Sequence, residues 1–210
     1  MYRTVGRNLS IFCFRLLKAI IERGFLLQKH GATAKPIRTL PSDFGTNEQA
    51  RLVKSGLEMQ MISSEMDSET EKWDEASNDI VKRAKNMSSM AYTMYLFTKG
   101  EGSLKTTQDL FTQAEFFTEE ANRLCRAIRE FSNQVPQGLQ KVELVSSLDK
   151  IPGLIQQLSL TIKNPTAGKT ATFNKVENVI QQTKDLMNSI AKVVTTCFIC
   201  ATKVDFSRRA

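Results

Sequence analysis

Two short stretches of this sequence carry residue types that could do chemistry. The first is Gly168-Lys169-Thr170, which has the residues that end a phosphate-binding loop. Such a loop needs a further glycine five positions before Gly168, because its backbone N–H groups must curl around the phosphates. Lys163 stands at that position, and a residue with a Cβ resists the positive φ angles that glycine accepts. The sequence therefore argues against nucleotide binding.

The second stretch is Cys197-Phe198-Ile199-Cys200, in which the two thiols have the spacing of zinc ligands. The sequence has no second pair of this kind, and its single histidine, His30, is far away along the chain. Reduced thiols that pack as small apolar groups in the cytosol are the favoured interpretation. We therefore expect no catalytic residues, no metal site, no cofactor-binding residues and no cofactor, and hence no enzyme.

Other side chains that could act together have simpler explanations. Glu119 and Glu120 are adjacent carboxylates, and we expect both to point along a solvated helix face. Met87, Met90 and Met94 recur at helical spacing, which is typical of core filling rather than of a cofactor site.

Charge is distributed unevenly along the 210 residues, whose net charge is +7. Residues 1–41 hold eight Lys or Arg and one acidic residue, whereas residues 42–80 hold three basic and ten acidic residues. Residues 150–210 hold nine basic and three acidic residues. The basic C-terminal part is therefore a candidate surface for an acidic partner.

The first 41 residues are predicted to lie outside the folded domain, as a basic amphipathic leader and linker. Residues 9–27 are apolar but carry Arg15, Lys18, Glu22 and Arg23, too many charges for a membrane span. A basic amphipathic segment could also lie on a membrane or direct import into mitochondria. We favour a leader outside the fold, joined to it by a linker with Pro36.

The chain from residue 42 to residue 206 reads as a series of long helices. Apolar residues recur every three or four positions in four stripes: Ile80, Ala84, Met87, Ala91 and Met94; Leu110, Ala114, Phe117, Ala121, Leu124, Ile128 and Phe131; Leu144, Leu148, Ile151, Ile155, Leu158 and Ile162; Phe173, Val176, Ile180, Thr183, Met187, Ile190, Val194, Cys197 and Ala201. A shorter acidic helix is expected earlier, with Leu52, Leu57, Met61 and Met66 as its apolar side.

Short loops between these helices favour an all-α fold, an antiparallel up-and-down bundle of four to five helices. Residues 99–102 and 136–138 carry the glycine and proline of helix ends, and Pro152 should bend or restart the third helix. In residues 164–171, Pro165 ends one helix, Gly168 makes the turn, and Thr170 or Thr172 can cap the next. Residues 207–210 then form a short basic tail.

Three motifs in the correct order resemble the C-terminal tail domain of the alpha-catenin and vinculin family. Trp73-Asp74-Glu75-Ala76-Ser77-Asn78-Asp79-Ile80 is similar to its W-D-x-x-x-N-D-I signature, and residues 97–105 to its F-T-R-G-K-G-P-L-K turn. Residues 183–188 and 201–203 are similar to its closing helix. The connection at 164–171 lacks the G-G-rich sequence of alpha-catenins, which indicates the alpha-catulin branch. That branch is usually described as a cytoskeletal and Rho-signalling scaffold.

The resemblance implies binding to actin filaments, which are acidic. The residues expected to bind actin or lipid lie on the last two helices and the tail: Leu160, Lys163, Lys169, Lys175, Lys203, Arg208 and Arg209. Of three apolar positions that contact actin in alpha-catenins, only Leu160 keeps an apolar side chain here. The other two fall on Gly153 and Asn164, which weakens the expectation of tight filament binding.

The leading hypothesis is a non-enzymatic adaptor that binds filamentous actin in the cytoplasm, at the cytoskeleton, cell cortex or junctions, and is linked to cell adhesion. One alternative is a Rho-signalling scaffold that binds a Rho exchange factor and has weak or no actin binding. Another is peripheral binding to acidic phosphoinositides. Nucleic-acid binding is not expected, because the basic residues are not interleaved with exposed aromatic side chains.

Overall fold

The computed structural model describes residues 41–73 and 78–209, with side chains up to residue 202. The predicted leader is therefore outside the described residues, apart from Pro41. A short 3₁₀ turn, Pro41–Asp43, is followed by six α-helices: α2 (Thr46–Glu71), α3 (Asp79–Thr98), α4 (Thr107–Gln134), α5 (Leu139–Leu148), α6 (Ile151–Lys163) and α7 (Lys169–Arg209). The described ranges contain no β-strand.

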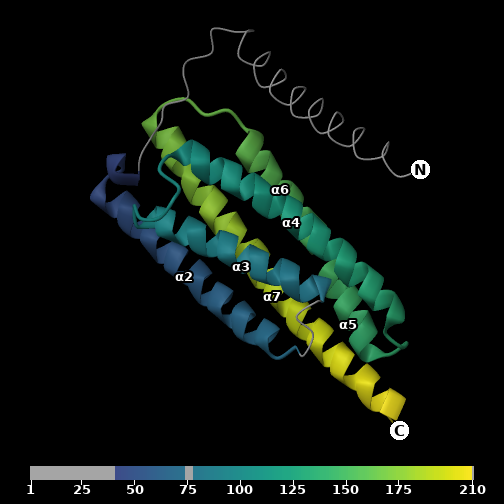
Figure 1. Ribbon diagram of the computed structural model, residues 1–210. Coiled ribbons are helices and arrows are strands. Elements are labelled where there is room, and N and C mark those ends of the chain that lie inside the picture. Colours follow the sequence, from purple (N-terminus) through teal and green to yellow (C-terminus); the bar gives the residue numbers. More distant parts are fainter. Residues whose placement is uncertain (1–40, 74–77, 210) are drawn as a thin grey trace, which may run out of the picture. The chain divides into compact units, whose positions relative to one another are not determined.

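The helices alternate in direction, and α5 and α6 together take the place of one helix in the bundle (Figure 1). The predicted all-α, antiparallel bundle of four to five helices is confirmed. Pro152 lies in the first turn of α6, where its missing N–H group leaves no hydrogen bond unmade. The expected restart of the third helix at this proline is therefore confirmed, and residues 207–209 continue α7.

The core is built from the four predicted apolar stripes. All of their members in α3, α5 and α6 are buried, and so are those in α4 and α7 except for Phe131 and Ala201, which are half-buried. Met87 and Met94 are fully buried, and Met90 packs against the core from its edge, as core filling requires. Long amphipathic helices are stabilised by burying such a stripe against their neighbours.

Helix α2 departs from its predicted pattern. It is 26 residues long rather than short, and Leu57 and Met61 are 47% and 64% exposed. Its buried face alternates large and small residues: Leu52, Gly56, Met59, Ser63, Met66 and Thr70. The prediction was right for Leu52 and Met66 but wrong for Leu57 and Met61. It counted only large apolar side chains, whereas small residues occupy every second position of this face.

These small residues let α2 and α3 approach closely. A Cβ added at Gly56 would lie 2.2 Å from the Thr98 hydroxyl oxygen, so no side chain fits there. The Ser88 hydroxyl donates a hydrogen bond to the Ser63 carbonyl oxygen, at 3.2 Å. The hydroxyl of a second α3 residue, Thr98, is satisfied within its own helix by the Tyr95 carbonyl. Close contact between these two helices therefore depends on residue size as much as on apolar character.

The predicted turns are present, with one correction. Gly100 and Gly168 have φ angles of 75° and 87°, which favour glycine. Helix α7 begins at Lys169, directly after Gly168, so Thr170 and Thr172 lie inside its first turn. The Thr172 hydroxyl donates to the Gly168 carbonyl, at 2.9 Å, whereas a capping side chain precedes the helix and accepts from its N–H groups. The predicted threonine cap was wrong.

A second correction concerns Glu120, which is buried rather than solvated. Its carboxylate accepts hydrogen bonds from Arg83 of α3 at 3.1 Å and from Arg123 at 3.2 Å. Arg83 also pairs with Asp79 at 2.8 Å, and its pKa is raised, mainly by this hydrogen bond. Only Glu119 lies on an exposed face as expected. Two adjacent glutamates face different environments because neighbouring helix positions point about 100° apart.

Candidate binding surface

Leu160 lies on the outer side of α6 and is 57% exposed. Its neighbours Leu158 and Ile162 belong to the buried stripe, and Leu160 falls between them in sequence but outside that stripe in space. A leucine this exposed has no role in the core. It is available for contact with a partner.

The two other positions implied by the resemblance are exposed but not apolar. Gly153 lies in the first turn of α6, and a Cβ added there would meet no atom within 4 Å. Asn164 follows the last residue of α6 and is also exposed. Leu160 is therefore the one large apolar side chain among these three positions.

Two lysines lie on either side of the connection between α6 and α7. Lys163 ends α6 and Lys169 begins α7, and both side chains are exposed. Lys163 also lines a small pocket with Glu115 and Glu119 of α4, and these two carboxylates reduce the positive potential on that side. The exposed cations at this end are thus Lys163 and Lys169.

Lys175 differs from Lys163 and Lys169, because its side chain is hydrogen-bonded to the C-terminal end of α6. Its ammonium donates hydrogen bonds to the carbonyl oxygens of Ile162, at 2.6 Å, and Asn164, at 2.8 Å. It also lies 4.3 Å from the centre of the Phe111 ring. Burial lowers its pKa, and the nearby charge of Glu115 opposes that shift. This lysine satisfies helix-end carbonyls and is only partly available to a partner.

Further along α7, Lys184 is also engaged within the bundle. Its ammonium pairs with Glu58 of α2 at 2.6 Å, and its side chain is 16% exposed. Lys192 is exposed. The side chains of Lys203, Arg208 and Arg209 lie outside the described part of the structure, although their backbone belongs to α7.

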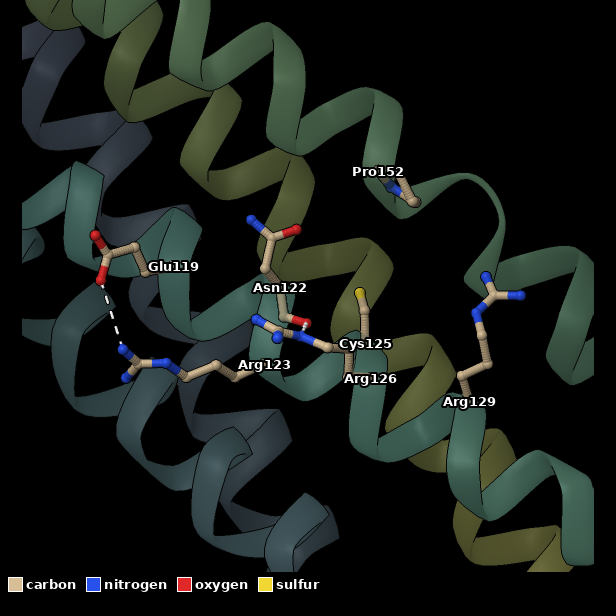
Figure 2. A pocket seen from close by; sticks show the side chains of 7 residues that line it. All are labelled: Glu119, Asn122, Arg123, Cys125, Arg126, Arg129 and Pro152. Carbon is tan, nitrogen blue, oxygen red and sulfur yellow. Dashed lines mark hydrogen bonds and ion pairs between the residues drawn. The ribbon is translucent and has the colours of Figure 1, made fainter.

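A second basic region was missed by sequence reasoning. We call it the arginine groove: an open hollow of about 540 Å³ between α4 and the start of α6, lined by Glu119, Asn122, Arg123, Cys125, Arg126, Arg129 and Pro152 (Figure 2). The spacing of three between its arginines was the available signal. It was missed because these residues sit among acidic ones in the sequence, so the segment has little net charge.

The three arginines of the groove have different partners. Arg123 is held by Glu119 at 3.6 Å and by Glu120 at 3.2 Å. Arg129 pairs with Asp149 at 2.9 Å, and both side chains are more than half exposed. Arg126 donates only to a carbonyl oxygen, that of Asn122, at 3.4 Å, as far as the described residues show.

The one thiol that lines the groove, that of Cys125, has low reactivity. Figure 2 shows the Cys125 thiol pointing from α4 toward the turn that carries Pro152. Burial raises the pKa of this thiol to about 11, so it is protonated near neutral pH and is a poor nucleophile. Burial also raises the pKa of Cys197, beside the buried Cys200.

Metal sites and membrane-spanning helices are two further features to consider among the described residues. No three or more His, Cys, Asp or Glu side chains among them are gathered so that they could hold a metal ion. None of the helices in the same ranges has the length and apolar character needed to cross a membrane.

Comparison with known proteins identifies the family. The model of the vinculin family matches residues 38–209. Alpha-catulin of Homo sapiens is 36% identical over 170 residues, which is 81% of this chain and 22% of that protein. Catenin alpha-3 of Homo sapiens is 31% identical over 165 residues (75% and 18%), and catenin alpha of Drosophila melanogaster is 32% identical over 144 residues (65% and 16%).

The chain therefore spans about a fifth of the length of these relatives. The match covers every described helix. It agrees with the motifs at residues 73–80, 97–105 and 183–203 and with the expected likeness to alpha-catulin. The chain belongs to the vinculin family.

Proposed function

We propose that this protein is a non-enzymatic cytoskeletal adaptor whose bundle binds actin filaments through the α6–α7 end. The observation that carries the proposal is the exposed Leu160 in the last turn of α6, together with exposed lysines at the end of α6 (Lys163) and the start of α7 (Lys169). Membership of a family that includes catenins supports it. The adaptor would act in the cytoplasm, at the cell cortex or at junctions.

The physical division of labour follows from the residue types. An actin filament is acidic, so exposed lysines steer the encounter and make association depend on salt. Lasting affinity comes from an apolar side chain that enters a desolvated pocket on the partner, which is the role of Leu160. Lys175 contributes mainly by keeping the end of α6 in place.

The same surface predicts weak binding. The positions of Gly153 and Asn164 offer no large apolar contact, so a single leucine must supply most of the apolar contribution. Filling the open space at Gly153 should therefore strengthen binding. A test can therefore look for a loss of affinity for filaments when Leu160 is truncated and for a gain when Gly153 is enlarged.

Cosedimentation with actin filaments at low salt tests the proposal. Leu160→Ala should weaken pelleting by roughly tenfold, a typical cost for an anchoring residue, while Gly153→Leu should strengthen it. Leu139→Ala is the matched control, because Leu139 is 79% exposed but lies on α5. No pelleting by the unmodified protein at micromolar concentration, or equal losses in both leucine variants, would overturn the proposal.

A scaffold for a protein partner is the second proposed function, and the arginine groove is the observation that favours it. A Rho exchange factor is one such partner within this proposal. Lys163→Glu with Lys169→Glu would separate the two functions, because filament binding should fall while scaffolding through α4 should persist. Lys175 is unsuitable for this test, because its loss would also disturb the end of α6.

A further inference from the structure

We propose that the arginine groove on α4 is a docking site for an acidic peptide segment of a protein partner. The proposal rests on the second proposed function, the scaffold for a protein partner, and the site is separate from the proposed filament-binding surface. Pro152, at the groove, and Leu160 are eight residues apart in α6, which is about 12 Å along the helix axis.

The first support is the spacing of the positive charges. Arg123, Arg126 and Arg129 are three residues apart on α4, so each lies about 4.5 Å further along the axis than the one before. Carboxylates one helical turn apart, or on alternate residues of an extended chain, are spaced by about 5–7 Å. A row of arginines can therefore meet successive acidic side chains of one segment.

The second support is that two of the three positive charges, those of Arg126 and Arg129, are available to a partner. The terminal N–H groups of Arg126 form no ion pair with a carboxylate among the described residues. Its one hydrogen bond within this part of the chain is donated by Nε to the Asn122 carbonyl oxygen. Both side chains of the Arg129–Asp149 ion pair are exposed, so the pair contributes little to the stability of the fold. A carboxylate of a partner can therefore take the place of Asp149. Arginine forks bind carboxylates with two parallel hydrogen bonds, which favours this exchange.

The third support is the form of the groove and the acids at its edge. A hollow beside a helix suits a single segment of chain, whereas a membrane presents a broad sheet of headgroups. Glu119 and Asp149 flank the arginines, and both would repel an anionic surface that covered the whole region. A peptide can place its carboxylates between these two acids. The half-buried Cys125 and the exposed Pro152 give the segment apolar contacts.

Fluorescence anisotropy with a labelled peptide of alternating glutamate and serine tests the proposal on the full chain. Arg126→Glu should weaken binding by at least ~10-fold, because one attractive charge becomes a repulsive one. Lys85→Glu makes the same change in charge at an exposed position of α3 and should weaken binding less than ~2-fold. A peptide with glutamine in place of glutamate should not bind.

Arg126→Gln provides a second, milder variant, and circular dichroism checks that every variant stays helical. Equal weakening by Arg126→Glu and Lys85→Glu would mean that net charge alone attracts the peptide, which would overturn the proposal. No binding of the glutamate peptide would overturn it as well. Vesicles of phosphatidylserine distinguish the other partner class: loss of vesicle binding specifically in Arg126→Glu would assign the groove to lipid instead.

Filament pelleting separates this inference from the proposed function. Arg126→Glu should leave cosedimentation with actin unchanged, and Leu160→Ala should leave peptide binding unchanged. If Arg126→Glu abolished both, the groove would be part of the filament-binding surface, and the proposal of a separate peptide site would be wrong.

Discussion

The interior contact between α3 and α4 and the exposed end formed by α6 and α7 use similar charged residues in opposite ways. Glu120 of α4 is enclosed by Arg83 of α3 and by Arg123 of its own helix, and its pair with Arg83 joins the two helices. At the α6–α7 end, Lys163 and Lys169 face solvent and form no ion pair with any other residue that the structure describes.

The difference teaches that residue type does not say whether a charge stabilises the fold or is left for a partner. Burial and the identity of the neighbour decide this. The contrast can be tested with matched pairs, each comparing one residue type in an enclosed and in an open position of the same bundle.

The largest effect is expected for Glu120. Glu120→Ala would remove the buried partner of Arg83, which keeps only its more exposed pair with Asp79, and should reduce the free energy of unfolding by about 2–3 kcal/mol. This is below the value for a fully buried pair, because Arg83 remains 25% exposed. Urea denaturation measures the change. The control, Glu119→Ala, should change stability by less than ~0.5 kcal/mol, and equal effects would contradict the enclosed role of Glu120.

A glycine pair should give the next largest difference. Gly56→Val forces a side chain against Thr98 in the contact between α2 and α3 and should destabilise the bundle by about 2 kcal/mol. Gly153→Ala adds a methyl group in open space within α6 and should stabilise by about 0.5–1 kcal/mol. Thermal unfolding followed by circular dichroism gives both values. A tolerated valine at Gly56 would refute the close approach of these helices.

The lysine pair should differ by less. Lys175→Met keeps the apolar stem but removes the donor to the Ile162 and Asn164 carbonyls, and should cost about 1 kcal/mol in the free energy of unfolding. Lys169→Met removes an exposed charge and should leave stability unchanged, while weakening filament binding at low salt. If both variants were equally stable, the hydrogen bonds of Lys175 to the end of α6 would not stabilise the fold, and Lys175 would resemble the exposed Lys169.

The smallest effect is a dependence on pH at Glu58. The hydrogen bond and charge of Lys184 lower the pKa of this carboxyl below 4.5, so its stabilising contribution is present above about pH 4.5. The contribution is lost as the pH falls through the lower, folded-state pKa. The stability difference between the unmodified protein and Glu58→Gln should therefore shrink on acidification. Glu65→Gln, on the exposed side of the same helix, should show no such change.

Much of the fold could be predicted because its signals are local. A stripe such as Leu144 to Ile162 repeats within a few residues, and a proline or glycine marks a helix end by its own backbone limits. Helix α2 was only partly predicted, because Gly56, Ser63 and Thr70 are buried for their small size, which depends on the partner helix.

The binding surface was less predictable than the fold. Leu160 stood out because it lies beside a buried stripe rather than on it, and the structure leaves it exposed. Lys175 was expected on the same surface, but its ammonium turns to the carbonyls at the end of α6. The arginine groove was missed, since it exists only where α4 meets the start of α6.

The sequence by itself determined the helical class, the apolar stripes, most of the turns and the family, because these depend on the type and spacing of nearby residues. Only the tertiary structure decided which charges are enclosed and which remain open. Lys184 meets Glu58, and Arg51 meets Glu177, across 126 positions of the chain in each case. Charge is carried by the residue, but its role depends on neighbours that folding brings from distant parts of the chain.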